Sequence, residues 1–339
     1  MKRLSILTLI VGIGVVAVAV LAANAQAVGA AFARAGSAAI LVIVLRYLAV
    51  ALAGVAWWFL FPSRQRPRLG LLVTLRFVRD GTNSLLPLAQ IGGDFIGARM
   101  LTFWGVAAAM AGATVLIDIL VQVVSQVVFT LAGFAVLAVR GGAGAVAFDV
   151  ALGLTLAIPA LAGFYVAQRH WGHKLLTIMV QRFAGAHETA LYNVDTLYRQ
   201  LEALYRRRAG VAKNFAIHLV EWIFNAAEVW VALSAMGYDI GYLNAFAIDS
   251  LSQALSSAAF LVPGAVGVQE GGLVLLCALY GVPAPAALAL SLIKRTADLG
   301  VGIPGLIFWQ GRELRQWWRG KRPESGGHCG AEANARRTR

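Results

Sequence analysis

Runs of apolar residues long enough to cross a lipid bilayer recur along almost the whole chain. Six have the length of a complete span: residues 4–23, 40–61, 113–139, 145–167, 214–236 and 284–309. In hydrocarbon a helix satisfies its own backbone hydrogen bonds, so runs of about 18 or more apolar residues predict transmembrane helices. Charged residues make up only 13% of the chain, against about 25% in soluble domains. The sequence therefore predicts an all-α, polytopic membrane protein.

Two further apolar stretches, residues 71–111 and 243–281, are interrupted by proline and glycine. The interrupting residues are Pro87, Gly92, Gly93, Pro263, Gly264 and Gly267. Proline lacks an N–H group and breaks a helix, whereas glycine permits a tight turn. We expect each stretch to form a re-entrant helical hairpin, which dips into the membrane and returns to the side it came from.

The distribution of basic residues supports this topology. The net charge is +13, and most Lys and Arg residues fall in four segments: 2–3, 64–79, 169–213 and 312–339. Positive charge beside spans marks the cytoplasmic face, where it also attracts anionic lipid headgroups. With two hairpins all four segments lie on one side, and both termini are cytoplasmic. No nucleic-acid recognition motif accompanies the charge, so nucleic acid is not an expected partner.

The N-terminus has two interpretations. Lys2, Arg3, an apolar stretch and then Ala23-Asn24-Ala25 resemble a secretory signal with a cleavage site. The stretch is longer than a usual signal core, however, and the repeat described next requires it. We interpret it as an uncleaved first span.

The predicted elements form two matching halves of opposite orientation. Residues 1–139 contain two spans, a hairpin and a span, and residues 140–310 contain the same series. Asp94 follows Pro87 by seven residues, and Glu270 follows Pro263 at the same offset. Secondary transporters often use such inverted repeats and place the substrate where broken helices meet near the midplane.

The segments outside the spans are amphipathic or basic. The connector at residues 168–213 carries an apolar stripe at helical spacing, formed by Leu191, Val194, Tyr198, Leu201 and Tyr205. We expect it to lie on the cytoplasmic membrane surface or to pack on the bundle, and a partner-binding role is an alternative. The tail at residues 311–339 is predicted to be largely disordered, with Trp317 and Trp318 as an interfacial anchor.

The two interrupted stretches resemble a known family. The resemblance rests on Asn83-Ser84-Leu85-Leu86-Pro87 with Gly93 and Arg99, on Pro263-Gly264-Ala265-Val266-Gly267-Val268-Gln269-Glu270-Gly271, and on Arg295. These segments resemble the lysylphosphatidylglycerol synthase transmembrane family, the flippase-like domain family of bacterial inner membranes. Residues 258–272 are similar to its branch associated with hopanoid biosynthesis.

The resemblance implies a lipid flippase of the bacterial inner membrane, with a hopanoid or a phospholipid as substrate and lipid-biosynthetic enzymes as further partners. Family members that aminoacylate phosphatidylglycerol carry a large cytosolic domain after the membrane part. Here only a short basic segment follows Trp309, so the resemblance supports the flippase half, and we do not expect an enzyme. No cofactor or metal is expected, since neither the histidines nor Cys277 and Cys329 show ligand spacing.

Candidate residues of the substrate pathway lie in and beside the predicted hairpins: Asn83, Pro87, Gly93, Asp94, Arg99, Pro263, Gly264, Gly267, Glu270, Lys294 and Arg295. Asp94 and Glu270 each stand where a returning half-helix would begin. One interpretation is helix capping by an acid in the field of the helix dipole. The other is that they face an aqueous cavity and bind a proton, a cationic headgroup or hydroxyl groups.

Further charges lie in or beside the spans: Arg46, Asp118, Glu221, Glu228 and Asp298. An unpaired charge in lipid costs about 2.5–3.5 kcal/mol on insertion scales, so pairing is expected. We expect Arg46 near Glu221, and Asp118 near Lys294 or Arg295. The pairs are either structural, or Arg295 or Lys294 contacts a lipid phosphate.

Three functions stay open at this point. The first is a lipid flippase or transporter. The second is a membrane scaffold for a lipid-biosynthetic complex, with the connector as its docking surface. The third is an intramembrane lipid-modifying enzyme with Asp94 and Glu270 as acid and base, which the missing nucleophile motif disfavours.

Overall fold

The computed structural model describes residues 25–85, 92–139, 188–258 and 267–320, and their regular secondary structure is helical throughout. The first part contains α2 (Ala25–Ala35), α3 (Ala38–Leu60), the short 3-10 helix η1 (Ser63–Gln65), α4 (Leu69–Leu85), α5 (Gly92–Thr102) and α6 (Ala108–Val139). The second part contains α9 (Glu188–Arg206), α10 (Arg208–Ala235), α11 (Tyr242–Ala258), α12 (Val268–Ala278) and α13 (Ala284–Gly320). The predicted all-α class is confirmed.

Three of the described helices, α3, α6 and α10, are long and apolar enough to cross a membrane. They correspond to the spans predicted at residues 40–61, 113–139 and 214–236. The predicted spans 4–23 and 145–167 lie outside the described residues. Helix α13 covers the predicted span 284–309 and continues to Gly320. The first part of the predicted tail is therefore helical, because α13 does not end at the membrane span.

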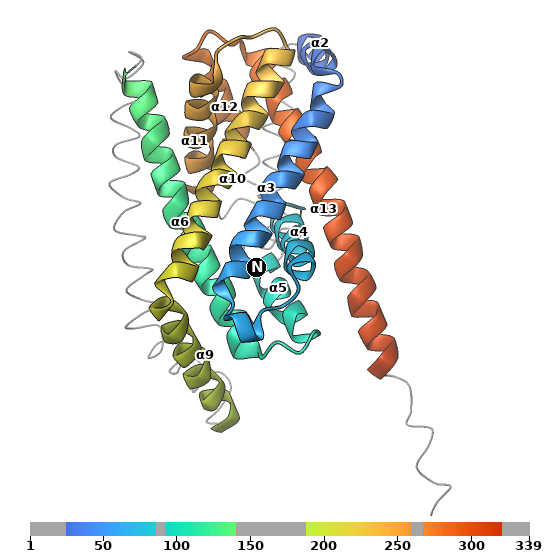
Figure 1. The fold of residues 1–339 in the computed structure, drawn as a ribbon. Helices are drawn as coiled ribbons and strands as arrows, with labels where there is room; N and C mark the ends of the chain where they lie inside the picture. The colour runs from blue at the N-terminus through green and yellow to red at the C-terminus, as the bar shows by residue number, and fades with distance from the viewer. Residues whose placement is uncertain (1–24, 86–91, 140–187, 259–266, 321–339) are drawn as a thin grey trace, which may run out of the picture.

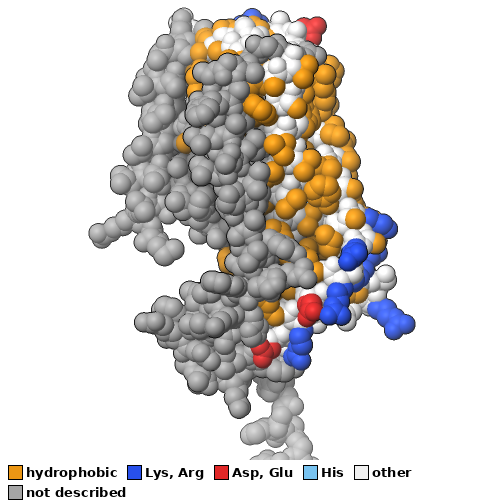
Figure 2. Space-filling model, turned by 90° about the vertical axis from the view of Figure 1, so that its left-hand side faces the viewer, with side chains coloured by type: hydrophobic (Ala, Val, Ile, Leu, Met, Phe, Trp, Pro, Cys, Tyr) orange, Lys and Arg blue, Asp and Glu red, His pale blue; other side chains and the backbone are white. Residues whose placement is uncertain are grey.

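The bundle has an apolar exterior and a partly polar interior. Large apolar side chains are exposed along the spans, among them Ile40, Leu41 and Val44 on α3 and Val128 on α6. Figure 2 shows a band of apolar side chains on one face, with Lys and Arg gathered towards its lower end. Exposed apolar side chains around buried charges are typical of helices that contact lipid.

Each half of the described fold contributes one pair of long helices and one pair of short helices. Helix α3 packs against α10, α4 packs against α13, and α6 packs against α11. The short pair α4 and α5 lies in the lower half of the bundle in Figure 1, and the pair α11 and α12 lies in its upper half. Both interrupted stretches thus contain two separate helices, while Pro87, Pro263 and Gly264 lie outside the described residues.

Small residues bring the two halves into close contact. A Cβ atom added at Gly81 on α4 would lie 2.7 Å from the Cα of Gly302 on α13. A Cβ added at Gly133 on α6 would overlap the side chain of Ser250 on α11. Small residues let helix backbones approach closely, and close packing drives helix association in a membrane.

Helix α9 packs against α6 through the apolar stripe predicted in the connector. Leu201 and Leu204 are buried there, and Tyr198 and Tyr205 are partly buried against the same hydrophobic cluster. Of the two expected positions of the connector, packing on the bundle is confirmed for this part. Residues 168–187 lie outside the described chain.

Candidate functional site

Two arginines of α4 enter the interior of the bundle. Arg76 and Arg79 are only 2% and 1% exposed. The prediction had counted them with the cytoplasmic segment 64–79, and for these two residues it is wrong. Residues three apart share one face of a helix, and this face of α4 is turned towards an acid on α6.

That acid, Asp118, is the centre of a buried polar cluster. Its Oδ2 accepts hydrogen bonds from Arg76 Nη1 at 2.9 Å and from Arg79 Nη1 at 2.8 Å. Its Oδ1 accepts a bond from Asn214 Nδ2 at 2.9 Å and lies 3.2 Å from His218 Nε2. Asp118 thus joins α4, α6 and α10, and its several donors stabilise a carboxylate that has no access to water.

Arg79 continues the cluster to the first turn of α5. Its Nε and Nη2 lie 2.9 and 2.7 Å from Asp94 Oδ1, and its guanidinium lies over the ring of Trp57. Asn83 accepts the backbone N–H of Gly93 at 2.7 Å and donates to Asp94 Oδ2 at 3.3 Å. A Cβ at Gly93 would overlap the carbonyl oxygen of Arg79, so only glycine permits this approach. The start of α5 is therefore held directly by α4.

The polar side chains of α10 complete this cluster. His218 Nδ1 lies 2.6 Å from Glu221 Oε2, so the imidazole stands between Glu221 and Asp118. Arg76 also pairs with Asp80 at 3.0 Å and donates to Gln122 at 3.0 Å. We call the following residues the first cluster: Arg76, Arg79, Asp80, Asn83, Asp94, Asp118, Gln122, Asn214, His218 and Glu221.

A second cluster lies at the start of α12. Glu270 Oε2 accepts the backbone N–H of Gly267 at 2.6 Å, and Oε1 accepts the hydroxyl of Ser291 at 3.0 Å. Arg295 Nη2 lies 3.2 Å from the same Oε1. Gly267 has φ +87°, a conformation that favours glycine. Glu270 therefore caps its own helix and also binds α13, so the capping interpretation describes only part of its contacts.

Three ion pairs connect further charged residues. Arg46 Nη2 lies 2.9 Å from Glu228 Oε2 and 3.8 Å from Asp298 Oδ1. Lys294 Nζ lies 2.5 Å from Asp249 Oδ1. The expected pairing of Arg46 with Glu221 is wrong, because Arg46 meets the acid two helical turns further along α10. The expected pairing of Asp118 with Lys294 or Arg295 is also wrong, since the partners of Asp118 lie on α4 and α10.

A comparison with models of known protein families finds one that matches most of the chain. Residues 5–305 match the family model described as the lysylphosphatidylglycerol synthase TM region. The chain belongs to this family. A search of curated proteins and of solved structures finds no match. Family membership, together with the long apolar helices, identifies a multi-pass membrane protein linked to lipid handling.

Several residues that carried the family resemblance are now placed. Asn83, Gly93 and Asp94 come together where α4 meets α5. Glu270 and Arg295 come together where α12 meets α13. The two groups belong to separate clusters on different helices.

Arg99 lies apart from both clusters. Its side chain is 66% exposed and pairs with Glu313 of α13 at 3.2 Å.

Several residues of these clusters and ion pairs were not predicted from the sequence: Arg76, Arg79, Asn214, His218 and Asp249. A usable signal was present on two helices. Polar residues on α4 recur at positions 76, 79, 80 and 83, and on α10 at 214, 218, 221, 225 and 228. Spacings of three and four residues place such side chains on one face. A polar stripe on an otherwise apolar helix thus indicates an interior face.

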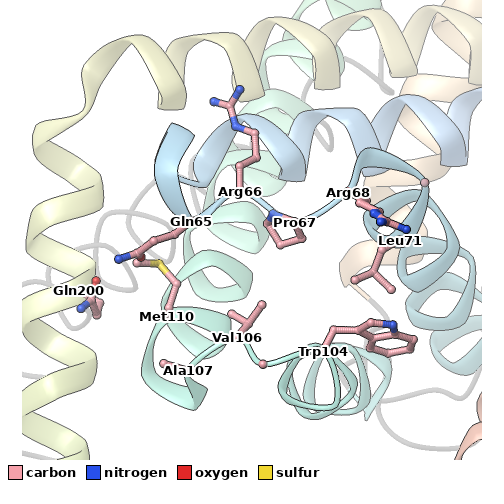
Figure 3. A pocket seen from close by; sticks show the side chains of 12 residues that line it. Gln65, Arg66, Pro67, Arg68, Leu71, Trp104, Val106, Ala107, Met110 and Gln200 are labelled. Carbon is pink, nitrogen blue, oxygen red and sulfur yellow. The ribbon is translucent and has the colours of Figure 1, made fainter.

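A cavity of about 980 Å³ opens at the basic end of the molecule (Figure 3). Its lining comes from η1 and the loop after it, the start of α4, the α5–α6 turn, the start of α6 and α9: Gln65, Arg66, Pro67, Arg68, Gly70, Leu71, Trp104, Gly105, Val106, Ala107, Met110 and Gln200. Arg66 donates to the carbonyl of Phe61 and lies 4.0 Å from the ring of Trp58. Figure 3 shows the Arg66 side chain turned away from the apolar lining residues Val106 and Met110, towards these partners.

Proposed function

We propose that this family member is a flippase that moves a polar lipid between the leaflets of the bacterial inner membrane. The observation that carries the proposal is the placement of charge inside the bundle. Acids begin two short helices, α5 and α12, in opposite halves of the bundle, and arginines bind both acids. Such charges offer a lipid headgroup a polar route, while its acyl chains stay in the surrounding hydrocarbon.

The proposal includes an inverted repeat in which α3 to α6 correspond to α10 to α13. The packing pairs support it, because exchanging corresponding helices exchanges α4–α13 with α11–α6 and leaves α3–α10 unchanged. The same exchange relates α2–α13 to α9–α6. With the basic end on the cytoplasmic side, α4 and α5 form a re-entrant hairpin from the cytoplasm, and α11 and α12 form one from the opposite side.

Movement of one repeat against the other supplies the mechanism. Gly81 and Gly302 meet at one contact between the halves, and Gly133 meets Ser250 at the other. At both contacts the helix backbones lie close together, and the proposal places the movement between the halves at these two sites. Rocking would expose the buried charges to each side in turn, as in other transporters with inverted repeats.

The chemistry of the arginines favours a lipid with a phosphate group. Arg68 lines the cavity at the basic end, and Arg295 keeps 25% of its side chain exposed while it binds Glu270. A guanidinium binds phosphate with two parallel hydrogen bonds. A phospholipid is therefore the first substrate to test, and the hopanoid suggested by the family branch is the second.

Reconstitution into liposomes tests the proposal. A membrane-impermeant reductant bleaches NBD-labelled phosphatidylglycerol in the outer leaflet, so loss of the protected inner pool reports lipid movement. We expect the wild-type protein to expose that pool and Gly267→Ala to slow the exposure at least about tenfold, because an alanine at positive φ strains the α12 start. Gly271→Ala is the matched control, since a Cβ there meets nothing within 4 Å.

The other functions predict different results in the same assay. A chemically altered lipid would indicate an enzyme. An inactive protein that co-purifies with lipid-biosynthetic enzymes would indicate a scaffold. One result would overturn the flippase proposal. In it, liposomes with the wild-type protein protect both labelled phosphatidylglycerol and a labelled hopanoid as well as empty liposomes do.

A further inference from the structure

His218 stands between two carboxylates in the interior of the bundle. Nδ1 lies 2.6 Å from Glu221 Oε2, and Nε2 lies 3.2 Å from Asp118 Oδ1. A neutral imidazole has one N–H donor and one lone pair. With both acids ionised, that lone pair would face a carboxylate oxygen. The three side chains are therefore complementary only when they hold one additional proton.

The surrounding charges increase this demand for a proton. The first cluster contains two guanidinium groups, on Arg76 and Arg79, and four carboxyl groups: those of Asp80, Asp94, Asp118 and Glu221. With a neutral imidazole the cluster carries two surplus negative charges, and with an imidazolium it carries one. Uncompensated charge in a buried site costs several kcal/mol, so proton binding there is favourable.

Groups on neighbouring helices do not remove this surplus. On the neighbouring helices, within the described ranges, the following side chains have partners outside the cluster: Arg46 with Glu228 and Asp298, Tyr47 with Gly300, Arg99 with Glu313, Arg199 with Thr196, Arg206 with Glu202, Arg207 with Leu60, Lys213 over the ring of Phe59, Tyr242 with Ile223, Lys294 with Asp249, and Arg295 with Glu270. Asp80, one of the four acids already counted, has a side chain that is 25% exposed and pairs with Arg76.

The position of the three groups links a proton to helix movement. Asp118 belongs to α6, whereas His218 and Glu221 belong to α10, which lies in the other half of the chain. Asp118 also holds Arg79, and Arg79 holds Asp94 at the start of α5. Loss of the imidazole proton would take one hydrogen-bond donor from the two acids and so change how Asp118 holds Arg79 and, through Arg79, α5. Protonation of the site and the position of the hairpin are thus coupled through the side chain of Asp118.

From this geometry we propose that Asp118, His218 and Glu221 form a proton-binding site that couples lipid movement to a transmembrane proton gradient. The proposal rests on the proposed lipid movement and names its energy source. The site takes up a proton from one side of the membrane in one arrangement of the two halves and releases it to the other side in the second arrangement.

An imposed pH gradient across proteoliposomes tests the coupling. The probe is NBD-labelled phosphatidylglycerol in vesicles of phosphatidylethanolamine and phosphatidylglycerol. With one proton moved per lipid, a difference of one pH unit shifts the steady-state distribution of the label by up to about tenfold. We expect this shift in the wild-type protein and in Glu202→Gln, whose exposed carboxylate lies outside the cluster. We expect no shift in His218→Gln and Glu221→Gln.

A second measurement examines the site without transport. Nitrogen NMR of ¹⁵N-histidine in the same vesicles reports the protonation of both ring nitrogens, and His218→Gln identifies the signal among the five histidines. We expect a doubly protonated ring near neutral pH in the wild-type protein and its loss in Glu221→Gln. This readout also separates a proton site from a folding defect, because the spectrum is recorded on inserted protein.

The outcomes separate the two proposals. Lipid movement that ignores the pH gradient, or that follows a sodium gradient instead, overturns the coupling and leaves the flippase function intact. Absence of lipid movement defeats the flippase function, and the NMR signal then decides the proton site alone. A ring that stays singly protonated over the whole pH range of stability overturns the site.

Discussion

The two short-helix pairs hold their first acids in different ways. Asp94 at the start of α5 binds Arg79 of the preceding helix α4, and that arginine is almost completely buried. Glu270 at the start of α12 caps its own backbone and binds Arg295 of the following helix, which is partly exposed. The first acid is thus locked into a network of four helices. The second is held by one arginine that a ligand phosphate could reach.

A second contrast concerns the sign of the charges. In the first half, the acid Asp118 on α6 faces arginines on α4. In the second half, the base Lys294 on α13 faces the acid Asp249 on α11. The helices that form the pair correspond under the proposed repeat, yet the charges are exchanged. Packing between the helices is thus alike in the two halves while the positions of acid and base are exchanged.

The largest effect is expected from Arg79→Ala. It leaves the carboxylates of Asp94 and Asp118 without their shared partner, and removing one member of a buried ion pair typically destabilises a protein by about 3–5 kcal/mol. Arg295→Ala should cost clearly less, because water reaches its side chain. Thermal unfolding of both variants in detergent micelles measures the difference. Equal losses would contradict the contrast between a buried arginine and a partly exposed one.

Much of the fold could be predicted from the sequence because hydrophobicity alone determines which segments enter lipid. The helices α3, α6 and α10 were predicted in this way, as were the two places where a long apolar stretch divides into two helices. The acids Asp94 and Glu270 were also predicted to begin short helices, because they follow proline and glycine at a fixed distance. Each of these features depends on residues that lie close together in the sequence, so a short sequence pattern is enough to predict it.

The pairing of charges could not be predicted in the same way. Glu221 and Glu228 lie two turns apart on the same face of α10. Periodicity therefore predicts that both acids share one face, but it does not predict which of them contacts Arg46. Arg76 and Arg79 were assigned to the cytoplasm because a count of basic residues ignores the direction of each side chain. Both errors concern relations between helices, which depend on how far each helix is shifted along its neighbour.

A smaller effect is expected where both members of a buried pair are removed together. Lys294→Met alone leaves Asp249 buried without its partner, and we expect a loss of a few kcal/mol. The double variant with Asp249→Leu should recover most of that loss, because apolar residues often replace a buried ion pair at little cost. A double-mutant cycle of thermal unfolding measures the recovery. If the double variant unfolds as readily as Lys294→Met, the pair has a further partner or a role beyond the contact between α11 and α13.

The smallest effect is expected at the exposed pair between Arg99 and Glu313, which joins α5 to α13 at the surface. Exposed ion pairs contribute about 0–1 kcal/mol, since water and salt screen them. Arg99→Gln should therefore change stability by less than about 1 kcal/mol and leave lipid movement within about twofold of the wild type. Arg295→Gln provides the matched comparison at a partly buried position. Arg99 was a candidate for the substrate pathway, so an equal loss of lipid movement in both variants would place Arg99 on that pathway and remove the distinction between interior and surface charges.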